Sequence, residues 1–198
     1  NDFLYPDTNN IMVFADNHDM SRVYTELGQD LAKTKMAMTL FLTTRGIAQI
    51  YYGTEILLDN TPSKDHGDIR IDFPGGFKNQ NANAFTGIGL SKEQRDMHKT
   101  ISTLLNFRKQ SPALTKGKLV HFSPNNGVYS YARVSDTQTV LVFMNKNKVT
   151  QKHNLDYMQE VIPKNANAQA LFTQHTFKLT NSINLKPMAA TVLVINTP

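Results

Sequence analysis

This sequence predicts an α/β unit followed by an all-β domain. In the first part, two strand-like apolar runs flank a helical pattern, an order that indicates parallel strands joined by a right-handed crossover. From residue 116 to residue 198, short strand patterns and turns follow one another without a helical pattern. Such spacing is typical of an antiparallel β-sandwich. We therefore place a domain boundary at residues 113–116, which gives units of 1–115 and 116–198.

The first unit is expected to contain two short strands and one helix. Residues 11–15 form an apolar run, and residues 47–52 are β-branched and aromatic, so both are predicted as strands. Residues 31–42 between them have a helical pattern, with Asp30 as the expected N-cap and Gly46 as the expected stop.

A long irregular segment separates these elements from a second helix. Residues 56–90 are rich in Pro, Gly, Asn and Asp, and a loop of this length in a compact protein usually has a function. Ser91 and Gln94 then form a capping box. Apolar residues at spacings of three and four predict an amphipathic helix that Pro112 ends.

The second unit is expected to be built from short strands. Asn126 and Gly127 give a strong hairpin signal between two of them. The predicted strands are residues 118–122, 128–134, 139–144, 170–171, 176–179, 183–185 and 191–195.

Composition excludes several functional classes. The chain of 198 residues has no cysteine, which excludes disulfides, thiolate metal sites and a cysteine nucleophile. The net charge of +5 comes from scattered basic residues, so a solvated surface is expected and no nucleic acid partner. No apolar run is long enough to span a bilayer, and no signal peptide is visible.

The densest group of reactive side chains is Asp16, Asn17, His18 and Asp19, which follows the first predicted strand. Catalytic groups collect at the C-terminal ends of parallel strands. Three interpretations remain open from these residues alone: metal binding, acid–base or charge-stabilising chemistry, and capping of the next turn. Glu55 lies at the end of the second predicted strand. It either faces the same C-terminal edge of the strands as residues 16–19, or it anchors the loop that follows through Arg45 or Arg70.

The segment 65–77 is dense in charge and ends in aromatic residues. Arg70 and Asp68 could bond sugar hydroxyls in a cleft, or the loop could be held by its own Asp–Arg pairs. From the residues alone, both interpretations of this segment remain open.

Together these motifs resemble the α-amylase family, glycoside hydrolase family 13. Residues 14–19 match its pattern Phe-x-x-Asn-His-Asp. Residues 46–55 match Gly-x-Pro-x-Ile-Tyr-Tyr-Gly-x-Glu, with Ala48 in place of proline. The segment 65–77 is similar to the neopullulanase and cyclomaltodextrinase branch, which is common in gut bacteria.

The resemblance implies the seventh and eighth strands and last helices of a TIM barrel, followed by a C-terminal β-sandwich. It implies that Asp19 is the catalytic acid that stabilises the transition state, and that His18, Asn17 and Arg70 bind substrate. The substrate would be an α-glucan, cleaved with retention, and the enzyme periplasmic or extracellular. No cofactor and no metal ligand are implied for this chain, whereas calcium is possible in the full-length enzyme.

Two consequences concern what the chain does alone. In this family the nucleophile and the acid/base come from earlier strands, so the chain is expected to be inactive without the N-terminal part of the barrel. The unpaired edges of the two barrel strands are expected to cause self-association, disorder in residues 1–90, or both.

Two alternatives concern the second unit. It could be a non-catalytic carbohydrate-binding module with an aromatic face of Phe122, Tyr129, Tyr131 and Phe143. It could also be a purely structural domain that shields the barrel.

Overall fold

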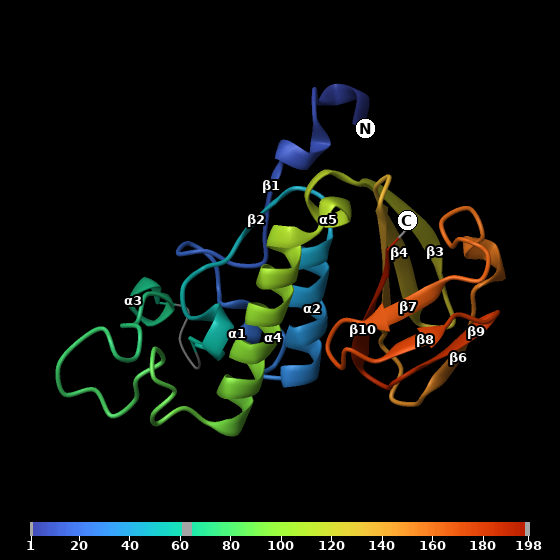
Figure 1. Cartoon of the computed structure of the whole chain (residues 1–198). Coiled ribbons are helices and arrows are strands. Elements are labelled where there is room, and N and C mark those ends of the chain that lie inside the picture. The colour runs from blue at the N-terminus through green and yellow to red at the C-terminus, as the bar shows by residue number, and fades with distance from the viewer. Residues whose placement is uncertain (1, 61–64, 197–198) are drawn as a thin grey trace.

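Two parallel strands and a helix form the centre of the first unit in the computed structural model, which describes residues 2–60 and 65–196 (Figure 1). Strand β1 (Met12–Phe14) pairs in parallel with β2 (Ile47–Gln49), with Met12 opposite Ile47. Helix α2 (Leu31–Thr43) makes the crossover between them. The predicted strand–helix–strand order and the parallel pairing are therefore confirmed.

Helix α2 begins as predicted but ends for another reason. The side chain of Asp30 accepts a hydrogen bond from the backbone N–H of Lys33 at 3.0 Å. The helix ends at Thr43, and Gly46 lies beyond it with a φ of +103°. A Cβ atom on Gly46 would collide with the carbonyl oxygen of Ile11, so this glycine permits the close approach of β2 to β1. Its prediction as the helix stop was wrong.

Helix α4 (Lys92–Gln110) packs beside α2, and its predicted capping box is present between Ser91 and Gln94. It ends before Pro112, but this proline does not end helical structure, because it opens helix α5 (Pro112–Lys116) with Ser111 as the N-cap.

The remaining helices are short: α1 (Val23–Glu26), α3 (His66–Ile69), and the 3₁₀ turns Asp2–Leu4, Thr8–Asn10, Thr54–Ile56 and Asp156–Met158. No helix among the described residues is long and apolar enough to cross a membrane.

The second unit is antiparallel, as predicted. Asn126 and Gly127 have φ of 48° and 72°, which fits the predicted hairpin turn. The main sheet has the order β3-β4-β5-β10-β7-β8, and a two-stranded sheet is formed by β6 and β9. The strands are β3 (Lys118–Asn125), β4 (Val128–Val134), β5 (Gln138–Asn145), β6 (Gln151–Asn154), β7 (Asn167–Ala170), β8 (Thr176–Lys178), β9 (Ser182–Leu185) and β10 (Ala189–Asn196). Strand β6 was not predicted, because its polar sequence lacks an apolar alternation.

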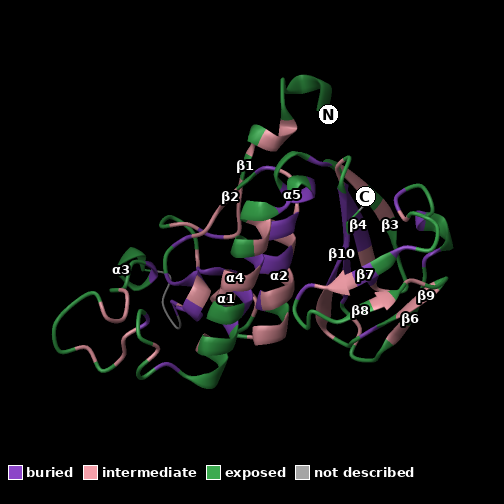
Figure 2. Cartoon of the chain, in the orientation of Figure 1, coloured by how far each residue is buried: buried purple, intermediate pink, exposed green. Residues whose placement is uncertain are grey.

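The six-stranded sheet has a hydrophobic core on each face. Its strands β4 and β10 are largely buried, as the purple colour in Figure 2 shows. Successive side chains of a strand point to opposite faces. Accordingly Val140 and Val142 of β5 pack with the helices, whereas Leu141 and Phe143 pack with the part of the domain that contains β6 and β9. The fold is therefore a layer of helices, a central sheet and a smaller second sheet.

The four rings of the alternative aromatic sugar-binding face do not lie on one face of the sheet. Tyr129 and Tyr131 lie on the helix side of the sheet, and Tyr131 is buried with its hydroxyl 2.5 Å from the hydroxyl of Thr43 on α2. Phe122 and Phe143 belong to the core on the opposite face. Alternation along the strands therefore separates the four rings, and the tyrosines join the second unit to the first.

The unpaired edges of strands β1 and β2 are consistent with the prediction of self-association. Within the described residues β1 and β2 pair only with each other, and Met12 and Ile47 are 55% and 56% exposed. Unpaired strand edges with apolar side chains recruit further strands. We expect concentration-dependent oligomers by size-exclusion chromatography with light scattering, and fewer of them in Ile47→Lys. A monomer at all concentrations would contradict this expectation.

A buried histidine makes the stability of the second unit depend on pH. His153 is 7% exposed, and its Nε2 lies 2.5 Å from the hydroxyl of Tyr157, which contacts Ser130 at 2.8 Å. Burial lowers the pKa of His153 from its ordinary value of 6.5. The unfolded state therefore binds the proton more tightly than the folded state, and acid favours unfolding.

We expect the free energy of unfolding to be constant above about pH 6.5 and to fall as the pH decreases through the lowered pKa of His153. Denaturant titrations between neutral and mildly acidic pH measure this slope. The slope should be smaller in His153→Gln and unchanged in His121→Gln, a control at an exposed histidine. Equal slopes in both variants would show that His153 is not responsible.

Candidate active site

The buried carboxylate of Asp16 joins the ends of the two strands. Asp16 lies two residues after the end of β1 and is 1% exposed. Its oxygens accept hydrogen bonds from the backbone N–H of Val23 at 3.0 Å and from the hydroxyl of Thr54, after β2, at 2.9 and 3.1 Å. Burial raises the pKa of Asp16. All its contacts are internal, so Asp16 corresponds to the capping interpretation of this motif.

Asn17 turns the chain so that the next two side chains face outward. Its side-chain oxygen accepts a hydrogen bond from the backbone N–H of Asp19 at 2.8 Å, an Asx turn. The side chains of His18 and Asp19 are 63% and 62% exposed, with His18 Nε2 3.2 Å from Asp19 Oδ2. One four-residue motif thus combines a buried structural carboxylate with an exposed one.

Arg70 completes a cluster that we call the Asp19 cluster: Asn17, His18, Asp19 and Arg70. Arg70 Nη2 lies 3.1 Å from Asp19 Oδ1, and its Nε donates to the carbonyl oxygen of His18 at 3.1 Å. The structure therefore brings together all four residues predicted for the site. It pairs Arg70 with Asp19 and not with an aspartate of its own loop.

The geometry gives each oxygen of Asp19 a different partner. Oδ1 faces the guanidinium of Arg70, and Oδ2 faces the imidazole of His18. The carboxylate is thereby oriented while most of its surface remains accessible. An oriented negative charge of this kind can stabilise positive charge that develops on a bound molecule.

A buried arginine that the sequence did not single out holds the loop of Arg70. Arg22 is 0% exposed, and its guanidinium donates to the carbonyl oxygens of Ile69 at 3.0 Å and Tyr52 at 2.8 Å. It lies 4.5 Å from the ring centre of Tyr51 and 5.1 Å from that of Tyr52. Ile69 directly precedes Arg70, so Arg22 fixes the backbone that presents Arg70 to Asp19. The signal available in the sequence was an arginine three residues after Asp19, together with the tyrosine pair at residues 51 and 52, just beyond β2.

Glu55 does not have either predicted partner. Arg45 pairs with Asp2 at 2.6 and 2.8 Å, and Arg70 pairs with Asp19. The Oε2 atom of Glu55 is buried and has no hydrogen-bond partner among the described residues. The described residues also contain no group of three or more His, Cys, Asp or Glu side chains that could hold a metal ion.

Comparisons with known families match both units. The family described as "Alpha amylase, catalytic domain" matches residues 4–85, and the family described as "Cyclo-malto-dextrinase C-terminal domain" matches residues 119–194. The chain thus joins part of an α-amylase catalytic domain to a C-terminal domain of the cyclomaltodextrinase type, and it belongs to the α-amylase family. Helices α4 and α5 lie between the two matched stretches, and the boundary at 113–116 stays a prediction.

Curated relatives are longer than this chain. A cyclomaltodextrin glucanotransferase of Paenibacillus macerans is 32% identical over 142 residues, which cover 72% of this chain and 17% of that protein. A maltogenic alpha-amylase of Bacillus acidopullulyticus is 28% identical over 160 residues, which cover 78% of this chain and 25% of that protein. The chain therefore spans at most about a quarter of the length of these two relatives.

Solved structures share the fold. The alpha-amylase of Geobacillus thermoleovorans, solved with acarbose, superposes with a TM-score of 0.75 at 22% identity over 96% of this chain and 40% of that one. AmyP, solved with maltose, gives a TM-score of 0.76 at 21% identity over 99% of this chain and 43% of that one. Similarity at this level of identity confirms the predicted fold, a partial α/β catalytic domain followed by an antiparallel β domain.

Proposed function

We propose that this chain supplies the transition-state-stabilising part of the active site of an α-glucan hydrolase. The single observation that carries the proposal is the Asp19 cluster, an accessible carboxylate oriented by Arg70 and His18 after strand β1. The family membership and the maltose and acarbose bound by similar structures support an α-glucan as the substrate.

The geometry of the Asp19 cluster supports the following proposed roles. Asp19 stabilises the positive charge of an oxocarbenium-like transition state. Its neighbours His18 and Arg70 orient the carboxylate and bond hydroxyl groups of the same sugar ring, and Asn17 holds the turn that presents Asp19. Retaining cleavage also needs a nucleophile and a general acid. We assign both to strands outside these 198 residues, so this chain alone should not turn over substrate.

The finer substrate assignment is to the neopullulanase and cyclomaltodextrinase branch. It is supported by the segment 65–77, which presents Arg70, and by the C-terminal family match. The second unit has a structural role in this proposal. Its Tyr131 hydroxyl contacts Thr43 of α2, and its buried Arg133 donates to the carbonyl oxygen of Gly117 and the side chain of Asn9.

Reducing-sugar release from pullulan, starch and cyclodextrin tests the proposal. The assay compares this chain with the same sequence extended upstream to its natural start. We expect release only by the extended protein, with pullulan and cyclodextrin among its substrates. Release by the chain alone that is lost in Asp19→Asn would contradict the assignment of the nucleophile and acid to other segments.

A further inference from the structure

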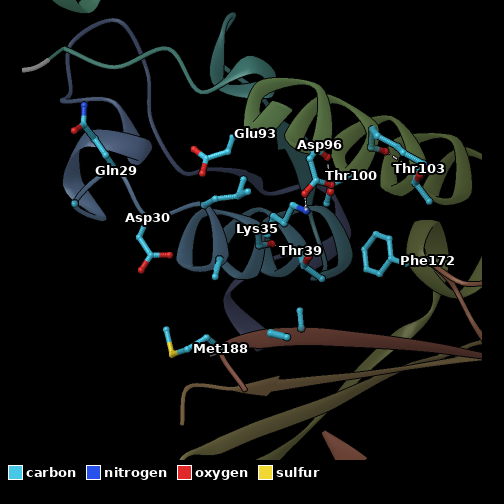
Figure 3. Close-up of a pocket in the computed structure, with 16 residues that line it drawn as sticks. Gln29, Asp30, Lys35, Thr39, Glu93, Asp96, Thr100, Thr103, Phe172 and Met188 are labelled. Carbon is cyan, nitrogen blue, oxygen red and sulfur yellow. Dashed lines mark hydrogen bonds and ion pairs between the residues drawn. The ribbon is translucent and has the colours of Figure 1, made fainter. Parts of the chain in front are cut away.

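A groove separate from the Asp19 cluster lies where the helices meet the β domain (Figure 3). We call it the helix–sheet groove; its volume is about 900 Å³. Lys35 of α2 and Asp96 of α4 lie in one wall, while Phe172 and Met188 approach from turns of the β domain. None of its lining residues belongs to the Asp19 cluster.

We propose that the helix–sheet groove binds a short segment of α-glucan as a second, non-catalytic site. The identity of the glucan rests on the proposed function. The existence of a sugar site rests on the groove itself, whose two walls differ in chemistry.

The helical wall offers hydrogen-bonding groups. Lys35 Nζ and Asp96 Oδ2 are 2.6 Å apart, with the Lys35 side chain 27% and the Asp96 side chain 50% exposed. The hydroxyls of Thr39 and Thr103 donate to carbonyl oxygens of their own helices at 2.7 and 2.8 Å. The donor of each hydroxyl is therefore used. Thr39 is buried, whereas the oxygen of Thr103 is accessible and can accept a hydrogen bond from a sugar hydroxyl.

The sheet wall offers apolar surface. Phe172 follows β7 and is 41% exposed, and Met188, Ala189 and Ala190 line the start of β10. A pyranose ring has an apolar C–H face and a rim of hydroxyl groups. An exposed aromatic ring opposite a polar wall matches both parts of such a ring.

Charge and size favour a neutral oligomer. Two lysines, 35 and 99, face three carboxylates, Asp30, Glu93 and Asp96, so the groove is close to electrically balanced. Strongly anionic and strongly cationic ligands gain little from such a lining. Along α4 the lining runs from Glu93 to Thr103, about 15 Å at the rise of an α-helix. The volume lies within the range of ligand sites, about 300–1,000 Å³.

Amide NMR titration of the 198-residue chain with maltohexaose tests the proposal. We expect saturable shifts at residues 93–103 and around Phe172. Phe172→Ala should weaken this binding at least about tenfold. Thr103→Val, which removes a hydroxyl without changing the shape of the side chain, should also weaken it. Phe85→Ala is the matched control, because Phe85 is a more exposed phenylalanine outside the groove.

The same spectra separate this proposal from the proposed function. Shifts confined to His18, Asp19 and Arg70 would overturn the groove and support the active site. Groove shifts that persist in Asp19→Asn would support the groove independently of the active site. Absence of groove shifts at millimolar maltohexaose would overturn the proposal, and equal groove binding of cellohexaose would overturn its α-glucan identity.

Discussion

Replacing Asp19 by asparagine in the upstream-extended protein should lower kcat/KM on starch by roughly 10²–10³-fold. Asparagine keeps the shape of the side chain but removes the negative charge between Arg70 and His18. The loss should be mainly in kcat, because the charge of the sugar develops only in the transition state. Steady-state kinetics on starch measure both parameters.

The fold should survive this substitution, because the Asp19 side chain is 62% exposed. Asp136→Asn, an exposed aspartate between β4 and β5, is the control and should leave kcat/KM unchanged. Wild-type kinetics in Asp19→Asn would exclude this carboxylate from the reaction. A large fall in melting temperature would instead attribute the lost activity to unfolding.

Replacing Arg22 by methionine should lower the free energy of unfolding by about 3 kcal/mol. Methionine fills the space but leaves the buried carbonyl oxygens of Tyr52 and Ile69 without their charged donor. The contacts of the guanidinium with the rings of Tyr51 and Tyr52 are lost as well. Chemical denaturation of the wild type and the variant measures the difference.

Arg45→Met is the matched control for Arg22→Met. Its partner Asp2 is exposed, and ion pairs with exposed groups contribute little to stability. Arg22→Met should also shift the NMR signals of His18 and Arg70, because the loop that carries Arg70 loses its anchor. A change in unfolding free energy no larger than that of Arg45→Met would contradict the anchoring role of Arg22.

Local rules predicted the local parts of this fold. The Asp30 N-cap, the Ser91 capping box and the Asn126-Gly127 turn each depend on neighbouring residues only, and all three are present. The alternation of side chains predicted that Tyr129 and Tyr131 share a face. It could not predict that α2 covers that face, since this depends on packing between distant segments.

In the candidate site, too, the local pattern was predictable and the contacts between distant segments were not. The motif predicted an important turn at residues 16–19, but sequence physics left three roles open for it. Burial decides between Asp16 and Asp19, since contacts with Val23 and Thr54 enclose the first carboxylate and leave the second exposed. Arg22 was missed because its partners, Tyr52 and Ile69, lie 30 and 47 residues away.

Trapping of the covalent glycosyl-enzyme intermediate tests the central claim most directly. A fluorinated α-glucosyl fluoride would be reacted with the upstream-extended protein, and the labelled peptide identified by mass spectrometry. We expect a label on an aspartate or glutamate outside these 198 residues, with no label when this chain is treated alone. A label on Asp19, or on any other carboxylate of this chain, would contradict the role assigned to the Asp19 cluster.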